Sequence, residues 1–212
     1  MRFSRCRELF GEDKFEKITE INVIIVGVGG VGGYALDCLY RTGVKNITIV
    51  DFDSFDESNQ NRQIGSENIG ISKVIALSKI YSGIVAIEQK VDSGWVQTFD
   101  FSKFDIVVDA IDDINAKVAL AHKTYKKLIC SLGSAKRVEP SFIKFDKISR
   151  VSGDRFFKKF KKELDISNFK KDFWVVYSDE SPKCSQKGSF VAVTASFGLR
   201  ICSEIIKKIF KG

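Results

Sequence analysis

The run Asn22-Val-Ile-Ile-Val-Gly-Val-Gly-Gly-Val-Gly32 carries the clearest structural signal in this chain. Its apolar run up to Val26 is typical of a parallel strand that is buried on both faces. The glycines that follow predict a tight turn, and residues 31–41 after them have helical spacing. A glycine turn between a strand and a helix indicates a phosphate-binding cradle, because the backbone can approach the ligand and the helix N-terminus offers unpaired N–H groups.

Strands and helices alternate on the C-terminal side of this stretch. Further strands are expected at residues 46–50, 84–90, 105–109 and 128–131, with helices at residues 71–81 and 114–127. This alternation predicts a Rossmann-like α/β fold, a doubly wound and mostly parallel sheet with helices on both faces. After Pro140 we expect strands at residues 141–145 and 173–177, a basic helix at residues 156–164 and a long helix at residues 190–210.

Composition limits the classes of protein that fit. With 212 residues, 44% of them hydrophobic, the chain suits one sizeable α/β domain. The charged N-terminus does not resemble a signal peptide and no apolar run reaches membrane-spanning length, so we expect a cytoplasmic protein without a membrane partner. Five scattered cysteines without a CxxC pair, and a single histidine, exclude a tetrathiolate zinc site and a histidine metal cluster.

The net charge of +7 is localised. Residues 136–171 contain twelve Lys/Arg and five Asp/Glu, so this segment carries the whole excess. A localised basic excess is expected for a polyanionic partner such as RNA. A solvated, lysine-rich helix face explains the same charge equally well.

The residues around the glycine turn are compatible with two different nucleotide ligands, NAD and ATP. Asp51 ends the second strand, where its carboxylate can accept hydrogen bonds from a ribose, and with the turn alone this favours NAD. The polar segment 51–63 contains Arg62, which can reach polyphosphate oxygens, and Lys73 opens the next helix. Asp112 follows the fourth strand, where it can hold magnesium. These charges suit phosphoryl chemistry on ATP better than hydride transfer, although a structural ion pair is an alternative for Arg62 and Asp112.

The motifs together resemble the ThiF/MoeB/HesA superfamily, the bacterial relatives of ubiquitin-activating enzymes. The matching residues are Gly27-Val-Gly-Gly-Val-Gly32, Asp51-Phe-Asp53, Ser58-Asn-Gln-Asn-Arg-Gln63, Lys73 and Ala110-Ile-Asp-Asp113. The resemblance covers about residues 2–134. It implies adenylation of a carboxylate with ATP and Mg²⁺, within a single domain over residues 1–212. This domain would consist of an N-terminal arm (1–20), a nucleotide-binding core (21–135) and a substrate-side extension with a C-terminal helix (136–212).

The resemblance also implies roles for individual residues. Those expected to bind the nucleotide are Gly27, Gly29, Gly30, Gly32, Asp51, Asp53, Asn59, Arg62, Lys73, Asp112 and Asp113. Arg62 and Lys73 would act in catalysis on the phosphates, and Asp112 would position magnesium. Members of the superfamily are usually homodimers in which an N-terminal arginine reaches the partner's site. Arg5 is the catalytic candidate for this role and Arg2 the alternative, while an exposed arm residue without such a role is equally open.

The second half resembles the tRNA threonylcarbamoyladenosine dehydratase family. The matching residues are Arg2-Phe3, Asn61-Arg-Gln63, Val175-Val-Tyr-Ser178 with Glu180 and Pro182, and Gly188-Ser189 leading to Val193-Thr-Ala-Ser-Phe-Gly198. This resemblance implies that the substrate is the carboxylate of threonylcarbamoyladenosine in tRNA, which is activated and then cyclised with loss of water. The basic excess agrees with tRNA, but the region between Pro140 and Val175 is shorter than in the usual members.

Two other functions remain open from the sequence. The first is adenylation of the C-terminus of a ubiquitin-like sulfur-carrier protein, with a sulfur-relay partner. Cys184, in a polar loop near lysines, would then be a reactive thiol, whereas an isolated cysteine is more often incidental. The second is an NAD-binding oxidoreductase or nucleotide sensor. Tight binding of NAD without binding of ATP would indicate this function.

Overall fold

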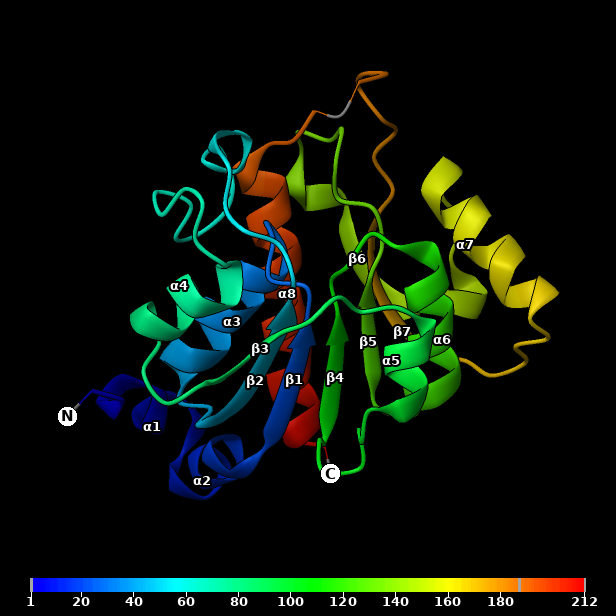
Figure 1. Cartoon of the computed structure of the whole chain (residues 1–212). Coiled ribbons are helices and arrows are strands. Elements are labelled where there is room, and N and C mark those ends of the chain that lie inside the picture. The colour runs from blue at the N-terminus through cyan, green and yellow to red at the C-terminus, as the bar shows by residue number, and fades with distance from the viewer. Residues whose placement is uncertain (1, 187, 212) are drawn as a thin grey trace.

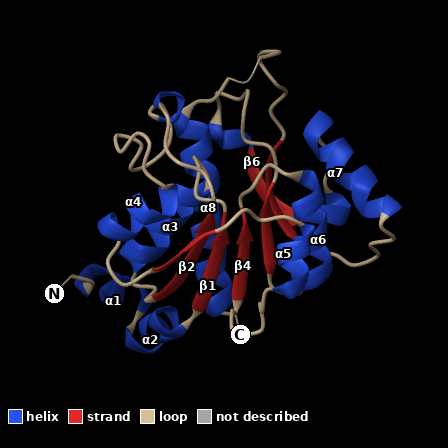
Figure 2. Ribbon diagram, in the orientation of Figure 1, coloured by secondary structure: helices blue, strands red, loops and turns tan. Residues whose placement is uncertain are grey.

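The computed structural model describes residues 2–186 and 188–211, and these contain a single seven-stranded sheet (Figures 1 and 2). The strands lie in the order β3-β2-β1-β4-β5-β7-β6. Their bounds are β1 Asn22–Val26, β2 Asn46–Asp51, β3 Val85–Glu88, β4 Ile106–Asp109, β5 Leu128–Ser131, β6 Ile143–Lys147 and β7 Trp174–Ser178. All neighbours pair in parallel except β6 and β7, which are antiparallel. The predicted doubly wound, mostly parallel sheet is confirmed.

Helices cover both faces of the sheet (Figure 2). Their bounds are α1 Ser4–Phe10, α2 Glu12–Glu20, α3 Gly32–Thr42, α4 Lys73–Ile80, α5 Ser93–Thr98, α6 Ile114–Thr124, α7 Arg155–Ile166 and α8 Val191–Ile209. One core lies beneath α3, α4 and α8, and a second beneath α5, α6 and α7. Along β1, Val23 and Ile25 enter the first core while Ile24 and Val26 enter the second, because successive strand side chains point to opposite faces. None of these helices, over the described residues, is long and apolar enough to cross a membrane.

The N-terminal arm contains two short helices. They meet at Gly11, whose φ of 80° interrupts helical geometry. The helix α5 was not predicted, because six residues are too short to show a helical period. Its start is fixed locally, since the Asp92 side chain accepts a hydrogen bond from the Trp95 backbone N–H.

The order of the strands reverses beside β1. Val26, the last residue of β1, pairs with Val50 of β2 on one side and with Asp109 of β4 on the other. In open α/β sheets, ligands bind at the carboxyl ends of the strands where the order reverses. The loops after β1, β2 and β4 therefore meet where a ligand is expected.

Helix α8 crosses α3 at very short range. A Cβ atom added at Gly198 would lie 2.4 Å from the Val31 carbonyl oxygen and 2.7 Å from the Ala35 backbone nitrogen. Four residues earlier, the Thr194 hydroxyl lies 3.3 Å from the position of a Cβ added at Gly30. The crossing therefore holds the start of α8 against the glycine turn.

Candidate nucleotide-binding site

The glycine turn after β1 is folded tightly on itself. Gly27 has a φ of 87°, and a Cβ there would lie 2.8 Å from the Ala110 carbonyl oxygen. A Cβ at Gly32 would lie 1.8 Å from the Gly27 carbonyl oxygen. Only glycine fits at these two positions, and its absence of a side chain brings the turn directly against the loop that carries Asp112.

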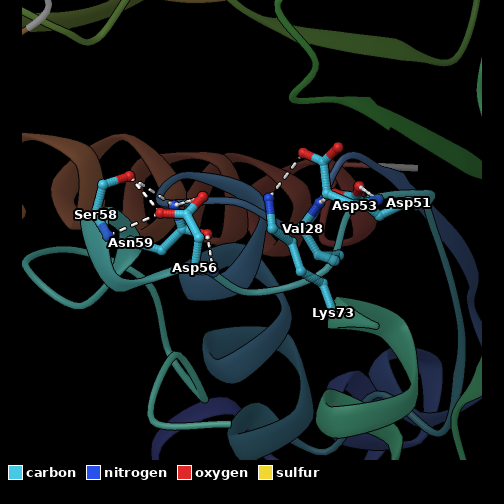
Figure 3. Close-up of polar contacts among 7 residues, drawn as sticks. All are labelled: Val28, Asp51, Asp53, Asp56, Ser58, Asn59 and Lys73. Atoms are coloured by element: carbon cyan, nitrogen blue, oxygen red, sulfur yellow. Dashed lines mark hydrogen bonds and ion pairs between the residues drawn. The ribbon is translucent and has the colours of Figure 1, made fainter. Parts of the chain in front are cut away.

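Asp51 connects the end of β2 to the glycine turn (Figure 3). One of its carboxylate oxygens accepts a hydrogen bond from the Val28 N–H at 2.8 Å, and the other accepts from the Asp53 N–H at 3.0 Å. Each carboxylate oxygen has a second lone pair. The predicted contact between Asp51 and a ribose hydroxyl is therefore compatible with this arrangement.

Lys73 begins α4 and is held in place by Asp53 (Figure 3). Its ammonium lies 2.9 Å from the Asp53 carboxylate, and its backbone N–H donates to the Asp53 carbonyl at 2.9 Å. The Lys73 side chain is only 7% exposed, and an ammonium has three donors. Asp53 thus orients a buried cation that keeps donors for a phosphate.

Residues 61–63 lie on the glycine turn. A Cβ added at Gly30 would be 3.2 Å from the Arg62 Cγ, and Arg62 Nη1 donates to the Ser58 carbonyl and the Asn61 amide oxygen, each at 2.8 Å. The other guanidinium N–H groups have no partner within the described chain. The arginine is therefore anchored through one nitrogen and keeps donors for a ligand.

Gln63 also lies beside the glycine turn, and one of its side-chain atoms is unpaired. Its buried side-chain oxygen has no hydrogen-bond partner among the residues that the structure describes, and its amide nitrogen lies 3.7 Å from a Cβ built on Gly29. Buried polar groups are nearly always paired, so this acceptor is an exception beside the glycine turn. A phosphate offers only acceptors and would not pair with this oxygen.

Asn59 has a local role. Its side-chain nitrogen donates to the Asp56 carboxylate at 3.1 Å, and its side-chain oxygen accepts from the Asp56 N–H at 3.4 Å (Figure 3). This reciprocal pairing shapes the short 3₁₀ turn Glu57–Asn59 that precedes Arg62. The predicted contact between Asn59 and a phosphate remains a prediction.

The two acidic residues after β4 differ in role. Asp113 caps α6, because its carboxylate accepts from the Ala116 N–H at 2.8 Å. Asp112 is exposed and forms no hydrogen bond or ion pair within residues 2–186 and 188–211. No cluster of three or more His, Cys, Asp or Glu that could hold a metal occurs in this part of the chain. A metal at Asp112 would thus need oxygens from phosphate or water, a ligand set that magnesium commonly takes.

Sequence reasoning missed a buried ion pair beneath this loop. The Lys117 ammonium lies 2.9 Å from the Asp109 carboxylate, both side chains are 0% exposed, and Lys117 also donates to the Ser131 carbonyl at 2.8 Å. Burial lowers the pKa of Lys117, but charge attraction and hydrogen bonds from Asp109 and Cys130 together outweigh it, so the pKa lies above its ordinary value. A lysine beside Ala116 and Leu120 on the buried face of the helix was the available signal.

Arg5 lies far from the glycine turn of its own chain. Helix α1 packs near the amino ends of the strands, where Cys6 contacts the Arg41 carbonyl at the end of α3 (Figure 1). The alternative residue, Arg2, stacks over the Tyr40 ring at 4.5 Å in the same region. The structure therefore does not bring either arginine to the site within one chain.

The substrate-side motif around Glu180 supports the backbone. The buried Glu180 carboxylate accepts hydrogen bonds from the N–H groups of Val138 and Glu139 at 3.0 and 2.9 Å. The loop that continues from it reaches the nucleotide side, because the Asn61 amide donates to the Ser189 carbonyl at 3.0 Å. Cys184 is exposed in this loop.

The sequence matches the ThiF family over residues 3–212. It is 32% identical over 202 residues to the tRNA threonylcarbamoyladenosine dehydratase of Bacillus subtilis, which covers 85% of this chain and 76% of that protein. It is 27% identical over 186 residues to the Escherichia coli protein of the same name, and this match covers 82% of the present chain and 68% of that protein. The structure is similar to that of E. coli tRNA N6-threonylcarbamoyladenosine dehydratase, TcdA, in complex with ATP, with a TM-score of 0.91, 26% identity and coverage of 99% and 94%. The chain therefore belongs to the ThiF family.

Proposed function

We propose that the chain is an ATP-dependent tRNA threonylcarbamoyladenosine dehydratase. It adenylates the carboxylate of threonylcarbamoyladenosine in tRNA and closes the product to the cyclic form. The observation that carries this proposal is the likeness to the ATP-bound dehydratase over 99% of the chain, which includes the substrate-side extension as well as the nucleotide core.

The residues around the glycine turn serve the first step. A carboxylate oxygen of the substrate attacks the α-phosphorus of ATP, and the bond to the bridging oxygen breaks, releasing pyrophosphate. The backbone N–H groups of the turn, Arg62 and Lys73 stabilise the negative charge that develops on the phosphates. One preorganised donor of this kind contributes roughly 10²–10³ in rate.

The second step needs no nucleophile from the protein. A nitrogen of the same substrate attacks the activated acyl carbon, AMP leaves, and the nitrogen loses its proton. Ring closure within one bound molecule is favoured because the reacting atoms are already held together.

Asp112 is the residue that we propose to hold magnesium. Its exposed carboxylate has no partner in the described chain and follows β4 beside the glycine turn. A bound Mg²⁺ would neutralise charge on the phosphate oxygens.

We further propose that residues 1–212 work as one adenylating domain within a homodimer. Arg5 lies at the amino ends of the strands of its own chain, so a catalytic Arg5 must come from a second copy. Arg5 of the partner subunit would then add a further positive charge at the phosphates.

The test combines a variant with product analysis. Asp112→Ala should lower ATP–pyrophosphate exchange by roughly 10²–10³ while the thermal unfolding midpoint stays within a few degrees of wild type. The matched control is Glu16→Ala, an exposed acidic residue of α2, which should exchange normally. Mass spectrometry of nucleosides should find cyclic threonylcarbamoyladenosine only when wild-type protein, ATP and modified tRNA are combined. Normal exchange in Asp112→Ala, or no cyclic nucleoside, would overturn the proposal.

A second function is favoured by one observation. Cys184 is exposed in a loop that Asn61 ties to the nucleotide side. Its thiolate would attack the acyl-adenylate of a sulfur-carrier protein, forming a thioester as AMP leaves. This function predicts pyrophosphate exchange that a carrier protein stimulates and tRNA does not. Alkylation of Cys184 that leaves adenylation and product formation intact would exclude the thiol from the reaction.

A further inference from the structure

Helix α7 has two opposite faces. Phe157, Phe160 and Leu164 are buried in the core beneath the sheet. The opposite side exposes a row that we name the basic stripe: Arg155, Lys158, Lys159 and Lys162. Their spacing of three, four and seven residues places all four side chains on one side of the helix. Because the apolar face fixes the rotation of α7, the basic stripe must face solvent.

The basic stripe is not neutralised by the rest of the protein. None of its four residues forms an ion pair or a side-chain hydrogen bond with any described residue. The ion pair on α7 joins Lys161 to Asp165 at 3.6 Å, to the side of the stripe. Exposed cations that are unpaired within the described chain also occur elsewhere, as at Lys45, but on α7 four of them lie along one side of a single helix. The stripe therefore presents a concentrated positive charge.

This arrangement destabilises α7 by itself. Arg155 lies in the first turn, and Glu163 and Asp165 lie in the last, so these charges oppose the helix dipole. The Asp154 cap offsets part of this effect at the N-terminus. Arg155 and Lys159, and Lys158 and Lys162, are like charges four residues apart, which also repel each other. A negatively charged ligand along the stripe would relieve both effects.

The N-terminus of α7 is tied to the candidate site. Its cap residue, Asp154, pairs with the buried Arg137 guanidinium at 2.7 Å. Arg137 also donates to the Gly133 carbonyl at 2.7 Å, in the loop that follows β5. At the end of β5, Ser131 accepts from Lys117, beneath the loop of Asp112. Figure 1 shows α7 on the outer side of α6, with its start toward the carboxyl ends of the strands.

We propose that the basic stripe is the surface on which the tRNA phosphate backbone docks beside the adenylation site. The inference rests on the proposed function and adds where its substrate is held. A row of unpaired cations along a helix matches a chain of regularly spaced phosphates, and such contacts fix the register of the nucleic acid without reading its sequence. The stripe thereby holds the modified nucleotide near Asp112.

The test removes charge from the stripe and, separately, the same charge from elsewhere. The stripe variant is Lys158→Gln/Lys159→Gln/Lys162→Gln. The control is Lys45→Gln/Lys79→Gln/Lys126→Gln, three exposed lysines near the amino ends of the strands. Dissociation constants for tRNA bearing threonylcarbamoyladenosine are measured over a series of KCl concentrations, and unfolding midpoints verify the fold.

We expect the slope of log affinity against log salt to decrease in magnitude by about 2 in the stripe variant, since each phosphate contact contributes about 0.7 on a single strand. The control should keep the wild-type slope. Equal slopes for the folded stripe variant and the wild type would overturn the inference while leaving the proposed function intact. Wild-type protein that neither binds tRNA nor forms the cyclic nucleoside would instead overturn the proposed function.

Discussion

The ion pair of Lys117 and Asp109 is the most strongly buried charge in the described site. Lys117→Met leaves the Asp109 carboxylate buried without its cation, while one oxygen of Asp109 already lacks a partner in the described chain. We expect the free energy of unfolding to fall by about 3–5 kcal/mol, as is typical when one partner of a buried pair is removed. Urea denaturation measures this change.

Two further variants test whether the loss of stability comes from the unpaired buried charge. Lys117→Met/Asp109→Leu removes both charges and should recover much of the stability, because no unpaired charge is left. Lys126→Met, at an exposed lysine after α6, should change stability by less than about 0.5 kcal/mol. A loss in Lys117→Met no larger than in this control would show that Asp109 is neutral in the fold.

The residues of the site were predictable from the sequence to different degrees. Asp51, Arg62 and Lys73 stand at fixed distances from the glycine turn, and the structure gathers them at the same end of the sheet. Their partners were not predictable. Asp53 and Lys73 form an ion pair because the loop between them brings their side chains together, and the course of that loop cannot be read from the sequence. The pairing of Lys117 with Ser131 depends on β4 and β5 being neighbours, which spacing along the chain does not fix.

At the scale of elements, the crossing of α3 and α8 depends on Gly198. Gly198→Ala introduces a Cβ within 2.4 Å of the Val31 carbonyl oxygen, so α8 must shift. We expect a loss of about 1–3 kcal/mol in unfolding free energy, the usual effect of overpacking. We also expect weaker ATP binding, because Thr194 of α8 lies against Gly30. Denaturation and calorimetric titration with ATP measure the two effects.

The control for this crossing lies on the same helix. Ser203 is exposed, so Ser203→Ala should leave both quantities within error or raise stability slightly through helix propensity. Weaker ATP binding in both variants would mean that the effect comes from α8 in general rather than from its contact with the glycine turn.

Some elements could be predicted from the sequence and others could not. The strands Asn22–Val26 and Leu128–Ser131 have the predicted bounds, since continuous apolar runs leave little ambiguity. The position of β7 between β5 and β6 could not be read from the sequence, because the next strand along the chain, β6, does not pair with β5, and β7 does so instead. The break at Gly11 depends on a positive φ that glycine permits but does not require.

At the scale of the whole molecule, the position of Arg5 makes a prediction about assembly. Helix α1 lies at the end of the sheet opposite to the glycine turn (Figure 1), so Arg5 cannot serve the site of its own chain in this conformation. Arg5→Ala should nevertheless lower pyrophosphate exchange by roughly 10²–10³ if its guanidinium contacts the phosphates of a second copy. Arg2→Ala is the matched comparison, because Arg2 stacks on Tyr40 of its own chain.

Mixing two inactive variants tests whether the site is shared between copies. In a two-fold symmetric dimer of Arg5→Ala with Asp112→Ala, one site has lost both residues and the other has both intact. Random exchange of subunits should therefore restore about a quarter of the wild-type exchange activity, since half of the dimers are mixed and each has one complete site. If both residues acted within one chain, every site would lack one of them and mixing would restore nothing. An activity that rises after unfolding and joint refolding of the two variants, and stays absent when each is refolded alone, would place Arg5 in the partner's site.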